Sequence, residues 1–192
     1  MSSEDQNKWD RLHAHPREDD KPSLFLNSIF EQFDVMLSTG RALDVACGKG
    51  RNALFLAERG FDVTAIDISS VALEEGRRRA EEKSLRISWQ QADLEQIELP
   101  QVFYDLIVNF NYLQRSLTPQ IKKSLKSGGH VIFETYLIDQ QIIGHPKNPA
   151  YLLEHNELLD LFKGMRVLWY REGKFTEDHQ ETYRAGLFAQ KQ

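Results

Sequence analysis

The stretch ALDVACGKGRNALFLAERGFDVTAIDIS, residues 42–69, decides the fold of this chain. An apolar run over 42–46 predicts a short buried strand, which the glycine-containing loop ACGKG follows. Helical spacing over 51–59 ends at Gly60, a typical helix C-cap, and the β-branched run over 61–67 predicts a second strand. Strand, loop, helix and strand form the unit from which parallel sheets are built.

The rest of the chain continues this alternation of helices and strands. The last two expected strands are joined by a short polar loop, so they must be antiparallel. The pattern predicts a doubly wound α/β fold with a mostly parallel sheet and helices on both faces. The expected helices cover 23–37, 51–59, 70–83, 117–126 and 156–162, and the expected strands cover 42–46, 61–67, 85–93, 104–110, 128–136, 165–173 and 181–190.

Length and composition indicate one globular domain. The chain has 192 residues, of which 41% are hydrophobic and 28% charged, which is typical of a soluble protein. Its net charge of −5 weighs against nucleic acid as a partner. The single cysteine, Cys47, cannot form an internal disulfide and favours a reducing cytoplasm. The sequence has no run of 18 apolar residues, so no membrane span is expected.

Two segments lie outside the alternating pattern. Residues 1–22 are polar and lack a secretory signal, so we expect an N-terminal arm, mobile at its start, before a single domain over 23–192. Trp9 is the exception in that arm, since a large aromatic side chain in a polar segment usually packs against another surface. The segment 137–153 fits neither period and is expected to be a functional or mobile insertion.

Three ligand classes compete for the glycine loop. A phosphate-binding P-loop needs G-x-x-x-x-G-K-[ST], which the sequence lacks. Gly48, Gly50 and Ala53 match the dinucleotide fingerprint G-x-G-x-x-G/A, and Asp67 lies in range of a ribose, so NAD remains open on this string alone. Asp44 at the strand end suits a cationic ligand such as S-adenosylmethionine, whereas its carboxylate would repel the negative charge of a pyrophosphate.

The loop resembles that of the class I S-adenosylmethionine-dependent methyltransferases. Their motif, an acid followed by x-G-x-G-x-G, appears here as Asp44-Val45-Ala46-Cys47-Gly48-Lys49-Gly50, with Ala46 in place of the first glycine. CGKGRNALFLAERGFDVTAIDIS and the WD near the N-terminus resemble the tellurite-resistance and thiopurine methyltransferase-like group. The resemblance covers roughly 23–190 and implies a seven-stranded sheet of order 3-2-1-4-5-7-6 with a C-terminal antiparallel hairpin.

The resemblance also implies roles for individual residues. Asp67 is expected to bind the ribose hydroxyls, Asp93 and Leu94 to flank the adenine, and Asn109 and Phe110 to lie near the methionine part of the cofactor. Cys47 is expected to pack rather than to act as a nucleophile. The expected cofactor-binding residues are Asp44, Ala46, Cys47, Gly48, Gly50, Asn52, Asp67, Ile68, Asp93, Leu94, Asn109 and Phe110.

The reaction expected is methyl transfer to a small-molecule acceptor by in-line displacement, with S-adenosylhomocysteine as the product. No convincing general base is visible, which suits an acceptor that is nucleophilic at neutral pH, such as a thiolate. The arm 1–22, with Trp9, and Phe25 beyond it are expected to fold over the cofactor as a lid. The expected acceptor-side residues are Tyr112, Arg115, Tyr136 and His145.

Two other functions stay open at this point. An NAD-dependent oxidoreductase agrees with the glycine string and Asp67, and a non-catalytic cofactor-binding regulatory module agrees with the missing base. The pair His13 and His15 has no companion ligand at metal-binding spacing, so no metal is expected. We expect neither a nucleic-acid nor a membrane partner, and either a monomer or a homodimer.

Overall fold

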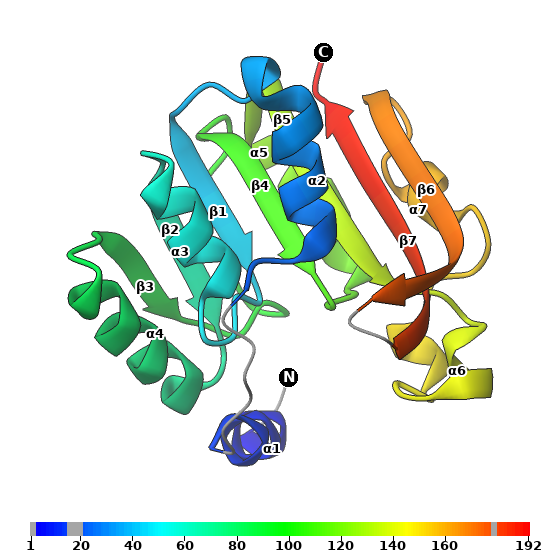
Figure 1. Ribbon diagram of the computed structural model, residues 1–192, viewed down its shortest axis with the longest axis horizontal. Coiled ribbons are helices and arrows are strands. Elements are labelled where there is room, and N and C mark those ends of the chain that lie inside the picture. The colour runs from blue at the N-terminus through cyan, green and yellow to red at the C-terminus, as the bar shows by residue number, and fades with distance from the viewer. Residues whose placement is uncertain (1–2, 15–20, 178–179) are drawn as a thin grey trace.

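A computed structural model describes residues 3–14, 21–177 and 180–192 of the chain, arranged around one seven-stranded sheet (Figure 1). The strand order is β3-β2-β1-β4-β5-β7-β6, which confirms the predicted fold. The strands are β1 (Arg41–Val45), β2 (Asp62–Asp67), β3 (Ile87–Gln91), β4 (Tyr104–Phe110), β5 (Leu125–Tyr136), β6 (Arg166–Glu177) and β7 (Gln180–Gln190). The α-helices are α1 (Ser3–His13), α2 (Leu24–Phe33), α3 (Arg51–Glu58), α4 (Ser70–Glu82), α5 (Thr118–Ser124), α6 (Gln140–Ile143) and α7 (Glu157–Leu161).

Strands β1 to β5 are parallel, and β7 runs antiparallel between β5 and β6. Strand β5 begins at Leu125, three residues earlier than the sequence pattern predicts. In this extension Leu125 pairs with Tyr104 of β4, and its carbonyl accepts a hydrogen bond at 2.6 Å from Nζ of Lys191, at the far end of the chain. Gly128 and Gly129 therefore lie inside the strand, where they exchange backbone hydrogen bonds with Lys191.

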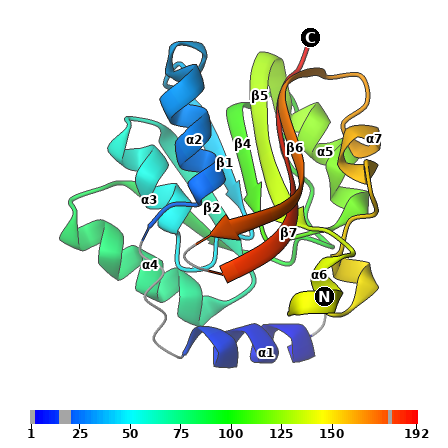
Figure 2. The ribbon, with the colours of Figure 1, turned by 45° about the vertical axis from the view of Figure 1, so that its right-hand side comes forward.

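Two apolar cores lie on the two faces of the sheet. On one face, α2, α3 and α4 cover a core that includes Phe25, Phe55 and Leu73 (Figures 1 and 2). On the other face, α5 and α7 cover a core that includes Ile121 and Phe162. Since both faces of the central strands β1 and β4 are covered, their sequences are mostly apolar, whereas the edge strand β3 has the sequence ISWQQ.

Trp89 of β3 occupies space that two glycines leave open. A Cβ atom at Gly50 would lie 2.2 Å from Cη2 of Trp89, and one at Gly76 of α4 would lie 2.6 Å from the same atom. Gly50 also has a left-handed φ of +75° at the start of α3. The Trp89 indole therefore packs against both the glycine loop and α4, and fixes their positions relative to β3.

The N-terminal segment contains a helix that the sequence pattern did not predict. Residues Ser3–His13 form helix α1, which lies across the carboxyl ends of the parallel strands in both views (Figures 1 and 2). The insertion 137–153 is also structured: it contains α6 and a backbone bridge between Leu137 and Leu153. Gln140, buried in α6, ties the insertion to β7 by accepting a hydrogen bond from the Tyr183 backbone at 2.8 Å.

None of the helices within the described ranges combines the length and the apolar composition that crossing a membrane requires. The possible metal partner of His13, His15, lies outside the described residues.

We expect the substitution Gly50→Ala to lower the free energy of unfolding by roughly 2–5 kcal/mol, from left-handed backbone strain and overpacking against Trp89. The matched control is Gly164→Ala, which has a φ of +89° but no atom within 4 Å of the added Cβ. It should lose only the backbone contribution, roughly 1–2 kcal/mol. Urea unfolding measures both, and equal losses would contradict the packing role of Trp89.

Candidate functional site

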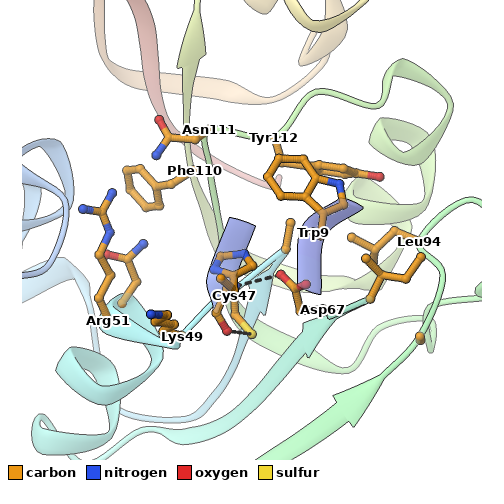
Figure 3. A pocket seen from close by; sticks show the side chains of 15 residues that line it. Trp9, Cys47, Lys49, Arg51, Asp67, Leu94, Phe110, Asn111 and Tyr112 are labelled. Atoms are coloured by element: carbon orange, nitrogen blue, oxygen red, sulfur yellow. Dashed lines mark hydrogen bonds between the residues drawn. The ribbon is translucent and has the colours of Figure 1, made fainter. Parts of the chain in front are cut away.

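A cavity of about 210 Å³ opens at the carboxyl ends of β1, β2 and β4, where the glycine loop and α1 meet (Figure 3). In an open α/β sheet this edge is the usual place for a ligand. Its lining residues are Trp9, His13, Ala46, Cys47, Gly48, Lys49, Arg51, Asn52, Asp67, Ile68, Ala92, Leu94, Phe110, Asn111 and Tyr112.

The glycine loop exposes backbone to the cavity through left-handed residues. Ala46 has a φ of +53° and Gly48 a φ of +54°. Ala46, which stands where the methyltransferase motif has glycine, thus adopts a glycine-like conformation at a cost of roughly 1–2 kcal/mol. A Cβ atom at Gly48 would lie 3.3 Å from Cε1 of His13, so α1 sits directly over the loop.

Asp67, at the end of β2, holds the loop in place. Its Oδ2 accepts a hydrogen bond from the Gly48 backbone at 2.7 Å, and its Oδ1 accepts one from the Ser69 backbone at 2.9 Å. A carboxylate has about four lone-pair positions, so two remain available to hydroxyl groups of a ligand.

Asp44 lies beneath the cavity, fully enclosed by the protein. Its side chain is 1% exposed, and its Oδ2 has no hydrogen-bond partner within the described part of the chain. Burial is the main cause that raises the pKa of Asp44 to about 7, with the Ala53 backbone and the Arg51 charge acting in the opposite direction. A buried acid with one unpartnered oxygen beside a ligand cavity fits a cationic ligand, as S-adenosylmethionine is at its sulfonium and amino groups.

Two side chains in the cavity wall are held in their protonated forms. Burial, with the nearby charges of Asp44 and Asp67, raises the pKa of the Cys47 thiol well above its usual value. Burial and nearby acids also raise the pKa of the Tyr112 hydroxyl, which donates a hydrogen bond to Gln114. Neither group is suited to act as a nucleophile or a general base at neutral pH.

Four of the expected cofactor residues are absent from the cavity wall. Asp44 lies beneath it, and the missing Cβ of Gly50 makes room for Trp89. Asp93 accepts a hydrogen bond from the Glu95 backbone at 2.8 Å, as turn aspartates do. The side chain of Asn109 is buried and donates to the Tyr112 carbonyl at 2.7 Å.

Of the expected acceptor-side residues, Tyr112 lines the cavity and three others have different surroundings. Arg115 pairs with Glu157 and donates to the carbonyl of Leu152 at 2.8 Å, which fixes the insertion. The Tyr136 hydroxyl accepts a hydrogen bond from Arg184 at 3.0 Å. The backbone carbonyl of His145 accepts a hydrogen bond from the side chain of Gln140 at 3.1 Å.

The other expected residues, Ala46, Cys47, Gly48, Asn52, Asp67, Ile68, Leu94 and Phe110, all line the cavity. Asn52 is also structural, because its Oδ1 accepts a hydrogen bond from the Ser23 backbone at 2.9 Å. Five lining residues were not expected from the sequence: His13, Lys49, Arg51, Ala92 and Asn111. All of these except His13 lie in or next to the glycine loop or a predicted strand end, which is the signal that could have found them.

No group of three or more His, Cys, Asp or Glu side chains within the described ranges has the arrangement of a metal site.

Comparison with known proteins agrees with this geometry. The family described as "Methyltransferase domain" matches residues 42–129. A probable S-adenosyl-L-methionine-dependent methyltransferase, TehB of Haemophilus influenzae, is 29% identical over 144 residues, which are 71% of this chain and 50% of that protein. A ubiquinone biosynthesis O-methyltransferase of Alkalilimnicola ehrlichii is 34% identical over 101 residues, 50% of this chain and 41% of that protein. The chain spans about half the length of these curated relatives.

Solved structures share the fold. The crystal structure of TehB from Haemophilus influenzae superposes with a TM-score of 0.74 at 23% identity, over 86% of this chain and 62% of that one. A structure solved for the conversion of a disulfide bond into a thioacetal group during echinomycin biosynthesis gives 0.73 at 17% identity, over 97% and 92% of the two chains.

The comparisons thus confirm the resemblance of this chain to the class I S-adenosylmethionine-dependent methyltransferases, which the sequence, the fold and the cavity share. Within that class the chain resembles TehB. The comparisons support S-adenosylmethionine as the cofactor, in place of the NAD that the glycine string left open.

The buried Asp44 predicts a specific pH dependence of stability. Between about pH 4 and about pH 7 the unfolded chain ionises this carboxyl while the folded protein keeps its proton, so the free energy of unfolding falls as pH rises. The shift corresponds to roughly 4 kcal/mol in total. Urea unfolding of the wild type and of Asp44→Asn should show a difference that grows across this range, and a constant difference would contradict the raised pKa.

Proposed function

We propose that this protein transfers the methyl group of S-adenosylmethionine to a small-molecule acceptor. The observation that carries the proposal is the cavity at the sheet edge, with the glycine loop and Asp67 in its wall and the Asp44 carboxyl, whose Oδ2 has no partner among the described residues, beneath it. The curated relatives include a ubiquinone biosynthesis O-methyltransferase, whose name also points to a small-molecule acceptor.

The bound cofactor supplies an activated methyl group whose leaving group is a neutral thioether. The protein's part is to hold the acceptor in line and to exclude water, which lowers barriers by roughly 7–11 kcal/mol in well-oriented reactions. Asp67 is placed to accept hydrogen bonds from the ribose, and Ile68 and Leu94 supply apolar walls for the adenine. A bound cationic cofactor would favour the ionised form of the Asp44 carboxyl beneath the loop, because an opposite charge nearby lowers the pKa of an acid.

The acceptor is expected to enter in a nucleophilic form. Cys47 and Tyr112 are both held protonated, so neither removes a proton from it. An acceptor such as a thiolate needs no such help at neutral pH. The cytoplasm, a reducing compartment, is the location that suits both the single cysteine and such an acceptor.

Calorimetric titration with S-adenosylmethionine, S-adenosylhomocysteine and NAD tests the cofactor site. We expect micromolar binding of the first two and none of NAD. Asp67→Asn should weaken both by about 10- to 100-fold, because hydrogen bonds to a charged carboxylate contribute roughly 1.5–3 kcal/mol. The control is Asp62→Asn, an exposed aspartate at the start of the same strand, which should bind as the wild type does. Equal affinities of the two variants would contradict the ribose site.

We further propose that α1 is a lid over the cofactor. Trp9 and His13 line the cavity from this helix, with their rings stacked 6.1 Å apart. Asp10 fastens the helix, since its Oδ1 accepts a hydrogen bond from the Ser69 hydroxyl at 2.6 Å, at the N-terminus of α4. On the other side Lys8 lies 5.8 Å from the ring centre of Tyr151, in the insertion.

Removal of this fastening should speed release of the product. We expect Asp10→Ala to raise the dissociation rate of S-adenosylhomocysteine about tenfold, because one charge-assisted hydrogen bond contributes about 1.5 kcal/mol. Asn7→Ala, an exposed change in the same helix, is the control and should leave the rate unchanged. Stopped-flow tryptophan fluorescence measures both rates, and identical rates would remove the lid from the proposal.

A further inference from the structure

A buried ion cluster lies beside the cavity, at the carboxyl end of β5. Glu134 of β5 has a side chain that is 1% exposed. Arg171 of β6 donates to its Oε1 from Nε at 3.1 Å, and Nη1 of Arg184 of β7 lies 3.8 Å from its Oε2. A buried carboxylate needs such partners, and the pairing in turn fixes both guanidinium groups.

Arg184 connects this cluster to the cavity wall. Its Nη1 donates a hydrogen bond to Oδ1 of Asn111 at 2.6 Å, and its Nη2 donates to the Tyr136 hydroxyl at 3.0 Å. The guanidinium also lies 4.2 Å from the ring centre of Tyr136. Asn111 lines the cavity, and its backbone N–H donates to the Glu134 carbonyl at 2.9 Å. Glu134 thus holds Asn111 both directly and through Arg184.

These contacts fix which way the Asn111 amide faces. A guanidinium has no acceptor atom, so the amide atom that meets Arg184 must be the oxygen. The nitrogen is left for a cavity ligand, and Figure 3 shows it on the side of Phe110 and Arg51. A ligand group at this place meets a donor of hydrogen bonds with positive charge behind it.

We propose that Asn111 determines which acceptors the enzyme takes, by donating a hydrogen bond from Nδ2 to a carboxylate or carbonyl oxygen that the acceptor carries beside its nucleophilic atom. Arg184 and Glu134 are positioning residues that act through Asn111. The inference rests on the proposed function and deepens it. Asn111 follows Phe110 at the end of β4, whereas Asp67 and Leu94, the expected adenosine contacts, lie on the β2 and β3 side of the cavity.

Two non-reacting probes of similar size test the polarity of this position. Benzoate offers only hydrogen-bond acceptors, and benzylamine offers only donors at neutral pH. Each is titrated calorimetrically into the protein saturated with S-adenosylhomocysteine. We expect the wild type to bind benzoate about tenfold more tightly, the ratio for one hydrogen bond to a charged group.

Substitutions of Asn111 should change this preference in opposite ways. Asn111→Asp replaces the donor with a negative acceptor and should favour benzylamine. Asn111→Gly keeps the left-handed φ of +58° that this residue adopts, removes the amide, and should bring the two affinities together. S-adenosylhomocysteine should bind both variants as it binds the wild type.

The positioning role needs its own readout. Arg184→Gln should reduce the preference for benzoate several-fold while the affinity for S-adenosylhomocysteine stays unchanged, because the amide is then free to flip. Arg166→Gln, an exposed arginine at the start of β6, is the control and should keep the preference. If Arg184→Gln does not fold, Tyr136→Phe removes one partner of the same guanidinium and should give a smaller loss.

The outcomes separate this inference from the proposed function. No preference in the wild type, no binding of either probe, or the same preference in Asn111→Asp would overturn the role of Asn111 while cofactor binding stands. Failure of S-adenosylhomocysteine to bind would overturn the proposed function, and this inference with it. An unchanged preference in Arg184→Gln would remove the positioning role alone.

Discussion

One carboxylate, that of Asp67, joins the parts of this structure that surround the cavity. It accepts hydrogen bonds from the Gly48 backbone in the loop after β1 and from the Ser69 backbone before α4. The Ser69 hydroxyl in turn donates to Asp10 of α1. The end of β2, the glycine loop, the first turn of α4 and the N-terminal helix are therefore linked through the side chains of Asp67 and Ser69, and a ligand bound to Asp67 would lie where these four parts meet.

Most of the fold could be predicted because its signals are local. Apolar runs bounded by glycine and proline gave the parallel strands, and the strand order followed from the resemblance to a known class. The differences come from contacts between distant residues. Strand β5 begins at Leu125, which pairs with Tyr104 of β4 and whose carbonyl accepts a hydrogen bond from the Lys191 side chain. Helix α1 has a polar sequence and is held by the hydrogen bond between Asp10 and Ser69, which are 59 residues apart. Neither contact leaves a periodic pattern in the sequence.

The same distinction applies to the site. Asp67 and Phe110 are the last residues of β2 and β4, and Leu94 lies three residues after β3, so their place at the sheet edge could be predicted from the strands alone. The surroundings of Arg115 depend on Glu157, a partner 42 residues away that sequence spacing does not reveal. Asn109 and Asn111 are two residues apart, yet one is buried against a carbonyl and the other lines the cavity, because the chain turns with a positive φ at Asn111.

The packing of Trp89 has a consequence for how such a sequence can change. Its indole fills the volume that Cβ atoms at Gly50 and Gly76 would occupy, so positions 50, 76 and 89 are coupled although they lie in a loop, a helix and a strand. A methyl group at either glycine becomes acceptable only after position 89 has a smaller side chain, and a smaller side chain at 89 alone leaves a void. Substitutions at the three positions should therefore accumulate together during divergence, and the last glycine of the loop is then preserved by its neighbour's shape, independently of any ligand.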